Sequence, residues 1–215
     1  MTRNLFQRSK APPAPSAFQF TTPGGLALPT ATLRRQLALV GGPLEVMHLT
    51  AHFMKQANEQ QIPLILLGGP QDSAFLDLPD LLELNPVRTA ALPRLLAGTS
   101  PEQLREVLTE ATSSFRSLLG SGPQILFTGR HLGGHWPFVM GRLPAFAQQG
   151  GVVIADVRNQ LSTPLPQVFN HFLVWPEGTE RMNRAVERWQ RHQSARPYRV
   201  EPEPEGSVAL WSATG

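Results

Sequence analysis

Short apolar runs of strand length alternate with longer amphipathic stretches of helix length along most of this chain, and this alternation limits the folds open to it. The apolar runs cover residues 36–40, 63–67, 124–127, 151–155 and 171–175. The amphipathic stretches cover residues 44–60, 101–119, 136–149 and 179–193. Buried strands separated by helices predict βαβ units, in which crossover helices join parallel strands. We therefore expect an α/β fold of three layers, with a mostly parallel sheet covered by helices on both faces.

The chain has the length of one such domain with short extensions. Of its 215 residues, 41% are hydrophobic and 16% are charged, so it can bury a substantial core. We expect an extended arm over residues 1–23, the α/β domain over 24–196 and a tail over 197–215. We expect one further short strand inside the domain over residues 82–84. Residues 207–211 are expected to form a last edge strand or to dock elsewhere.

The two extensions carry apolar side chains that a lone domain has little reason to expose. These side chains are Phe6, Phe18, Phe20 and Trp211. We expect them to anchor the chain to a partner, and the alternative is that both extensions fold back on their own domain.

Cysteine is absent from the sequence, which excludes disulfides, thiolate metal sites and a cysteine nucleophile. No run approaches 18 apolar residues, and the basic N-terminal segment lacks the apolar core of a signal peptide. We therefore expect a cytoplasmic protein without membrane insertion.

A glycine pair, Gly41-Gly42, ends one predicted strand and is followed directly by a predicted helix. Strand, glycine turn and helix N-terminus together form the setting of a phosphate-binding loop. A working Walker A loop, G-x-x-x-x-G-K-[ST], also needs a lysine for the phosphates and a hydroxyl for magnesium. Counted from Gly41, the positions of the second glycine, the lysine and the hydroxyl hold Val46, Met47 and His48. The sequence thus predicts a nucleotide loop that has lost its chemistry.

Over residues 24–175 the order of segments resembles the FtsK/HerA group of P-loop ATPases and their conjugation relatives. The Walker A strand of that family is resembled by Arg35-Gln-Leu-Ala-Leu-Val-Gly-Gly-Pro, and its Walker B strand by Ile125-Leu-Phe-Thr-Gly. Leu84-Asn-Pro, which precedes the Walker B strand, and residues 149–160, which follow it, resemble two further family segments. The resemblance implies a RecA-like P-loop NTPase core, in which Thr128 and Gly129 occupy the two Walker B carboxylate positions.

The same resemblance implies a catalytically inactive subunit with a structural or regulatory role in a larger assembly. It implies protein partners, with an intact ATPase paralogue as one candidate, and DNA as a further candidate partner. No cofactor is expected. The alternative fold is an unrelated Rossmann-like α/β domain that also has glycine turns.

A basic stripe on the last predicted helix carries a second functional hypothesis. At 100° per residue, four arginines fall within about 80° of one another beside an apolar face. They are Arg181, Arg184, Arg188 and Arg191. Such a stripe predicts contacts to nucleic-acid phosphates or to an acidic partner, and the competing interpretation is a solvated helix face.

Histidine pairs and single carboxylates carry a third hypothesis, a small-molecule or metal enzyme with its site at the strand C-termini. His48 and His52, like His131 and His135, have the i,i+4 spacing at which two imidazoles can bind one metal. Asp156 ends an apolar strand, where it is either an active-site carboxylate or a structural partner of Arg158. A run of acidic residues is better explained by exposed charges on a turn and short strand than by metal ligands. It consists of Asp77, Asp80 and Glu83.

Overall fold

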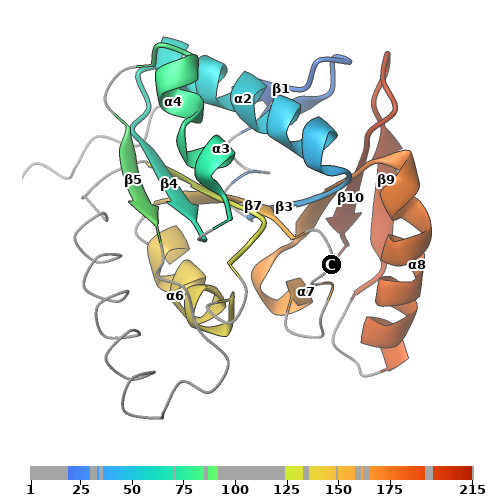
Figure 1. The fold of residues 1–215 in the computed structure, drawn as a ribbon. Coiled ribbons are helices and arrows are strands. Elements are labelled where there is room, and N and C mark those ends of the chain that lie inside the picture. Colours follow the sequence, from blue (N-terminus) through green and yellow to red (C-terminus); the bar gives the residue numbers. More distant parts are fainter. Residues whose placement is uncertain are drawn as a thin grey trace, which may run out of the picture.

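The computed structural model describes residues 19–29, 33, 36–69, 71–84, 87–91, 124–132, 136–148, 150–157, 161, 165–191 and 196–214. Within these residues the chain forms a two-stranded sheet and an eight-stranded sheet (Figure 1). In chain order the elements are β1 (Gln19–Thr21), β2 (Ala27–Pro29), β3 (Leu37–Val40), α2 (Pro43–Glu59), β4 (Leu64–Gly68), α3 (Ser73–Leu76), α4 (Leu78–Leu81), β5 (Arg88–Ala91), β6 (Ile125–Thr128), α6 (Trp136–Gln148), β7 (Val152–Asp156), α7 (Leu165–Val168), β8 (His171–Val174), α8 (Pro176–Arg191), β9 (Tyr198–Pro202) and β10 (Ala209–Ala213).

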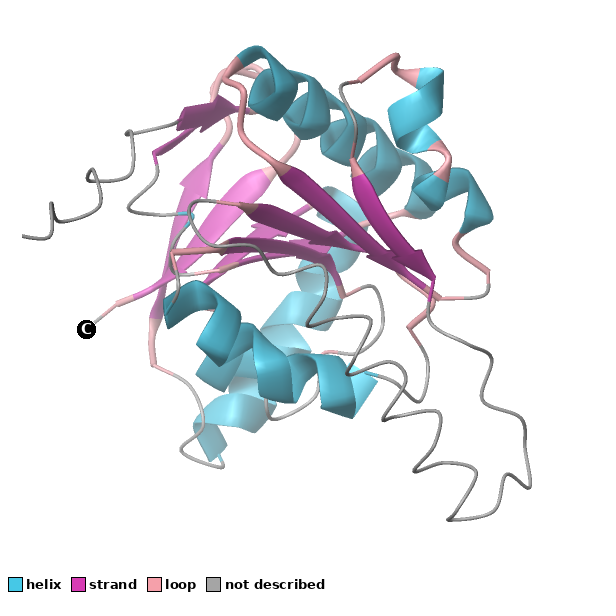
Figure 2. Cartoon of the chain, turned by 90° about the vertical axis from the view of Figure 1, so that its left-hand side faces the viewer, coloured by secondary structure: helices cyan, strands magenta, loops and turns pink. Residues whose placement is uncertain are grey.

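The large sheet has the strand order β5-β4-β6-β7-β3-β8-β10-β9, and its first six strands are parallel. Helices α2, α3 and α4 cover one face, and α6, α7 and α8 cover the other (Figures 1 and 2). The predicted α/β fold of three layers with a mostly parallel sheet is therefore confirmed. In the dinucleotide-binding fold the first strand lies beside the second and the fourth. Here the first parallel strand, β3, lies between β7 and β8, so the order is not that of a Rossmann domain.

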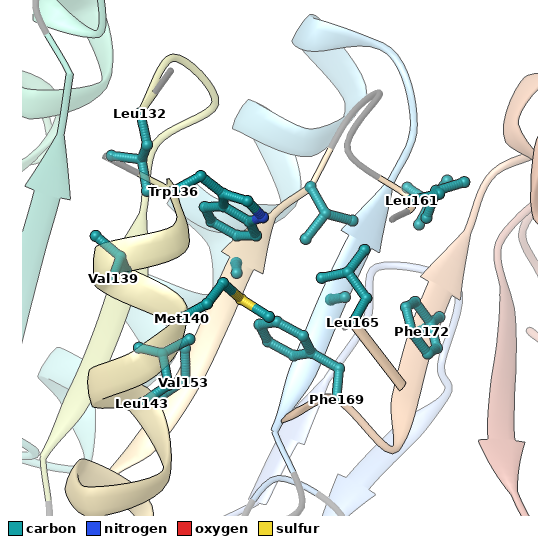
Figure 3. Packing of buried hydrophobic residues seen from close by; sticks show 14 of the residues in the cluster. Leu132, Trp136, Val139, Met140, Leu143, Val153, Leu161, Leu165, Phe169 and Phe172 are labelled. Carbon is teal, nitrogen blue, oxygen red and sulfur yellow. The ribbon is translucent and has the colours of Figure 1, made fainter. Parts of the chain in front are cut away.

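The predicted strands and helices of the central region coincide with observed elements to within about three residues. Strands β3, β4 and β6 are buried at every residue, as expected for strands covered on both faces. On one face α2 buries Val46, Leu49 and Phe53. On the other, α6 sets Trp136 and Met140 beside the residues around α7 (Figure 3).

The segment between β4 and β6 differs from the prediction. Residues 82–84, predicted as a strand, form the turn after α4, and the strand of this region is β5 at Arg88–Ala91. Helix α4 begins directly after Asp77, with Leu78 and Pro79 in its first turn, where proline is favoured. Residues 82–84 therefore follow the end of a short helix and do not form a strand. The predicted helix at 101–119 lies outside the described residues.

Both predicted extensions contribute to the folded domain. Phe20 of β1 is fully buried and stacks on Phe53 of α2, with ring centroids 5.1 Å apart. Trp211 of β10 is 9% exposed and belongs to the core on the face that α6, α7 and α8 cover. The expectation that these two side chains anchor a partner is wrong, since each packs on its own chain. Phe6 and Phe18 lie outside the described residues.

The C-terminal residues form a hairpin that extends the sheet. Strand β10 pairs with both β8 and β9 and is therefore internal, whereas the predicted edge strand was placed at 207–211. The outer strand is β9, which ends at Pro202, and proline is tolerated there because its missing N–H removes no bond from a central strand. Tyr198 of β9 contacts Phe172 and Trp189, and burial raises its pKa to about 12.

A buried carboxylate joins the turn between β9 and β10 to the turn between β1 and β2. Glu203, in the turn after β9, is 8% exposed. It accepts hydrogen bonds from the Thr22 hydroxyl and, at 2.7 Å, from the Gly24 N–H, both in the β1–β2 turn. Gly24 leaves the room for this contact, because a Cβ there would lie 2.3 Å from Glu203 Cδ.

We expect Glu203→Ala to lower the free energy of unfolding by about 3 kcal/mol, because it leaves buried donors of the β1–β2 turn without an acceptor. Urea unfolding followed by circular dichroism measures the change. Glu205→Ala is the matched control, since Glu205 is exposed and its loss is expected to cost less than about 0.5 kcal/mol. Equal effects of the two substitutions on the free energy of unfolding would contradict the role of Glu203 as the buried acceptor of the β1–β2 turn.

Candidate functional site

The carboxyl ends of β3, β4, β6 and β7 meet at one edge of the sheet, where open α/β sheets place their ligands. A cavity of about 190 Å³ lies there between the strand ends, α2 and α3. It is smaller than the roughly 300–1,000 Å³ of sites for drug-sized ligands. Its lining includes Met47, Thr50, Phe75, Thr128, Arg130 and Asp156.

The glycine turn after β3 is too short to wrap a phosphate. Strand β3 ends at Val40 and α2 begins at Pro43, so only Gly41 and Gly42 connect them. Pro43 explains the early start, because its fixed φ suits the first helical position. The predicted nucleotide cradle is thus replaced by a direct passage from strand into helix.

The residues at the Walker A positions consequently lie on α2 rather than in a loop. Val46 is buried in the core, Met47 is half-buried at the cavity and His48 is exposed. A lysine at position 47 would project from a helix instead of closing a loop around phosphate. Both the residue types and the backbone depart from a working loop.

The N-terminus of α2 is complemented by the chain's own carboxylates. The Gly42 N–H donates a hydrogen bond of 2.8 Å to Oε1 of Glu177, which lies in the first turn of α8. Glu45 lies in the first turn of α2 itself. Negative charge at a helix N-terminus is stabilising, and here it comes from side chains. Any anionic ligand would have to compete with them.

Arg130, two residues beyond the end of β6, links three strands at this edge. Its Nε donates a bond of 2.8 Å to Oδ2 of Asp156 on β7, and its Nη2 donates one of 3.2 Å to the Gly41 carbonyl after β3. The two charged side chains are 7% and 9% exposed, so the ion pair is buried. The structural interpretation of Asp156 holds, with Arg130 as its partner. Arg158, the partner considered from the sequence, lies outside the described residues.

Asp72, in the loop before α3, joins the glycine turn after β4, Gly68-Gly69, to the end of β6. It is buried, and its carboxylate accepts bonds from the Gly69 N–H at 2.8 Å and the His131 N–H at 3.0 Å. A Cβ at Gly69 would lie 1.9 Å from the His131 carbonyl oxygen. The glycine is therefore required for close packing of the two loops.

The residues predicted to occupy the Walker B positions, Thr128 and Gly129, carry no carboxylate. Thr128 ends β6 and is buried, and its Oγ1 has no hydrogen-bond partner among the described residues. A Cβ at Gly129 would lie 2.4 Å from Oδ2 of Asp72, which leaves no space for a carboxylate side chain. The nearby Nη1 of Arg130 is also buried and has no partner within the described part of the chain.

Two of the histidines predicted as weak metal ligands, His48 and His131, line different hollows. His52 Nε2 is 2.9 Å from the Thr21 carbonyl oxygen and 2.6 Å from Gln56 Nε2. His48 lines a groove beside the β1–β2 turn, whereas His131 lines the cavity at the strand ends. His135 lies outside the described residues. Within the described ranges no three histidine or carboxylate side chains are grouped so that they could hold a metal ion.

The acidic run at 77–83 is exposed at each of its three carboxylates, in agreement with the interpretation as surface charges. Asp77 lies at the N-terminal boundary of α4, Asp80 lies inside that helix and Glu83 follows it. These residues do not line the cavity.

The basic stripe lies on the outer face of α8. Met182, Ala185 and Trp189 are buried against the sheet, as the helical periodicity predicted. An open groove of about 580 Å³ runs along the exposed face, where Arg188 Nη2 donates a bond of 3.3 Å to the Leu161 carbonyl. Its lining consists of Arg181, Arg184, Arg188 and Arg191 with Glu187 and Leu161. Arg184 also forms an exposed ion pair with Glu180, which reduces the free positive charge of the stripe.

Arg130, Asp72 and Glu177 are the site residues that sequence reasoning did not single out. Arg130 had one available signal, since it follows the predicted Walker B strand by two residues. Glu177 had none, because it belongs to the start of a helix far along the chain from Gly42.

No known protein family and no curated protein matches this sequence. Two solved structures show a similar course of the chain. One is the genome packaging NTPase B204 from Sulfolobus turreted icosahedral virus 2 in complex with AMPPCP. Its sequence is 11% identical, the match covers 84% of this chain and 97% of that chain, and the TM-score is 0.42. The other is B204 in complex with ATP-gammaS, with 10% identity, 82% and 96% covered, and a TM-score of 0.43.

The α/β fold itself follows from the strand order and the helices of this chain. The chemistry of the site follows from this chain's own residues. Among the helices in the described part of the chain, none combines the length and the apolar character needed to cross a membrane.

We expect Arg130→Met or Asp156→Leu alone to lower the free energy of unfolding by about 3–5 kcal/mol, because each leaves a buried charge without its partner. The double substitution removes both charges and is expected to cost less than either single one. Guanidinium unfolding of the four proteins measures the coupling. Additive losses would show that the pair is not a unit. Arg130→Lys tests the geometry, since an ammonium lacks the planar fork that serves both Asp156 and Gly41.

Proposed function

We propose that this protein is a P-loop-like ATPase core that does not hydrolyse ATP and acts as a structural or regulatory subunit of a larger assembly. The observation that carries the proposal is the passage from β3 into α2 through two glycines, with the Gly42 N–H already bonded to Glu177. Where a phosphate would bind, the chain supplies its own anion.

At each position where a P-loop ATPase carries a residue needed for phosphoryl transfer, this chain carries a residue that cannot do the same. Hydrolysis needs a phosphate-binding lysine, a magnesium ligand and a residue that positions water. The corresponding positions hold Met47, Thr128 and Gly129, and Asp72 fills the space beside Gly129. Asp156, a carboxylate at the same edge, is neutralised by Arg130.

The resemblance of the sequence to FtsK/HerA ATPases supports an assembly role, because a core that keeps its fold without its chemistry still has surfaces for related subunits. We infer that the partner is a protein, with an intact ATPase paralogue as the candidate. The enzyme alternative has less support, since the cavity is small and His48 lies in a different groove from His131.

We expect no ATP turnover above background at millimolar ATP and magnesium. We also expect no nucleotide-dependent rise in melting temperature, because a ligand raises the melting temperature only by binding the folded state, and we expect no such binding. A coupled phosphate-release assay and differential scanning fluorimetry measure both. Glu45→Gln/Glu177→Gln separates a blocked site from absent chemistry. It is expected to remain inactive, because the lysine and the carboxylates are still missing. Turnover by either protein would overturn the proposal.

A second candidate function is nucleic-acid binding by α8, and the open arginine-lined groove is the observation that favours it. Arg188 and Arg191 are exposed at the C-terminal end of the helix, where their charges also complement the helix dipole. Phosphates lying along the groove would meet cations from successive turns of one helix.

For this function we expect salt-dependent binding of a labelled duplex, measured by fluorescence anisotropy, with a slope of log K against log salt of about −0.9 for each phosphate contact. Reversing all four stripe arginines to glutamate should abolish binding. Lys55→Glu, a charge reversal at an exposed position on α2, is the control for reversing one positive charge outside the stripe. Binding that survives the fourfold reversal would reject this role.

A further inference from the structure

The outer edge of β9 is an open strand edge whose hydrogen-bonding residues can be identified. Among the described strands, β9 pairs only with β10. Two backbone bonds fix the phase of this pairing, from the Glu203 N–H to the Val208 carbonyl at 2.8 Å and from the Thr214 N–H to the Pro197 carbonyl at 2.9 Å. Since paired residues of an antiparallel ladder alternate between bonded and non-bonded, the odd-numbered residues of β9 bond to β10.

The even-numbered residues of β9 therefore direct their backbone groups away from the sheet. Tyr198 and Val200 each present an N–H and a C=O at the edge, and Pro202 presents a C=O alone. Unpaired groups of this kind are a template for another strand.

We propose that a second copy of this chain pairs antiparallel with β9 about a twofold axis at Val200. In this register Val200 faces Val200 of the second copy and exchanges both backbone bonds with it. The Tyr198 N–H of each copy donates to the Pro202 carbonyl of the other. The two large sheets then join into one continuous sheet across an isologous interface.

Side-chain charge selects this register. Arg199 and Glu201 are both exposed and lie on one face of β9. With the axis at Val200, Arg199 of each copy lies opposite Glu201 of the other, in the non-hydrogen-bonded pairs where side chains approach most closely. Moving the axis to position 199 would set two arginines opposite each other, and moving it to 201 would set two glutamates opposite each other. Opposite charges favour pairing and like charges oppose it, so the neighbouring registers are disfavoured.

The other face of β9 offers an apolar contact in the same register. Val200 is 47% exposed, an unusual exposure for a large aliphatic side chain in the described part of this protein. Pairing about Val200 brings the two valines together and sets each Tyr198 opposite Pro202 of the second copy. With one twofold axis at Val200, each face of β9 is thus complementary to the same face of β9 in the second copy.

Sedimentation equilibrium of the full chain is expected to show a concentration-dependent dimer. Val200→Pro removes only an outward N–H and leaves the bonds to β10 intact, so it is expected to give a folded monomer. Arg199→Glu and Glu201→Arg each create two like-charge pairs and are expected to weaken dimerisation about tenfold or more. Lys55→Glu, which makes the same charge change as Arg199→Glu on exposed α2, should leave the dimer unchanged.

Mixing the two charge variants is the decisive measurement. Arg199→Glu of one copy faces Glu201→Arg of the other with opposite charge in both pairs, so the mixture is expected to form a heterodimer that neither variant forms alone. Differently tagged variants and native mass spectrometry identify it. Folding of each variant is checked by circular dichroism. A wild-type protein that stays monomeric up to about 1 mM, or a mixture that stays monomeric, would overturn the proposal.

Discussion

The buried guanidinium of Arg130 holds the functional edge of the sheet together. It joins the end of β6 to Asp156 on β7 and to the carbonyl that follows β3, and these three neighbouring strands define the edge. A charged pair buried this deeply is stable only when its partners are fixed, so the loops around it are constrained in turn. This edge of the sheet thus contains the positive charge of Arg130, which the carboxylate of Asp156 balances.

The glycine turns after β3 and β4, at Gly41-Gly42 and Gly68-Gly69, serve packing at this edge. A Cβ at Gly41 would lie 2.5 Å from the Trp175 ring, and one at Gly69 would meet the His131 carbonyl. Glycines that approach a neighbouring side chain or backbone have the same sequence signature as glycines that approach a phosphate, since both require the absence of Cβ. This explains why the motif indicated a nucleotide loop and the structure shows tight contacts between loops.

Two contacts attach segments near both limits of the described residues to the domain. Glu203 ties the β9–β10 hairpin to the β1–β2 turn, and Phe20 packs into α2. These contacts convert both predicted extensions into parts of the domain as far as residues 19–29 and 196–214 are concerned. They leave β9 as the outermost strand, with its charged and apolar residues on opposite faces.

The sequence by itself determined the central elements, because strand and helix periodicities depend on which residues of a short segment are buried. It gave β3, β4, β6, β7 and β8, the helices α2, α6 and α8, and the loss of the Walker residues. Tertiary structure alone decided the strand order, the pairing of Arg130 with Asp156, the capping of Gly42 by Glu177 and the internal position of β10. Each of these depends on groups that are distant in the chain, such as Gly42 and Glu177, and local periodicity carries no information on such contacts. The length of the glycine turn lies between the two cases, since Pro43 is visible in the sequence but its effect depends on where β3 ends.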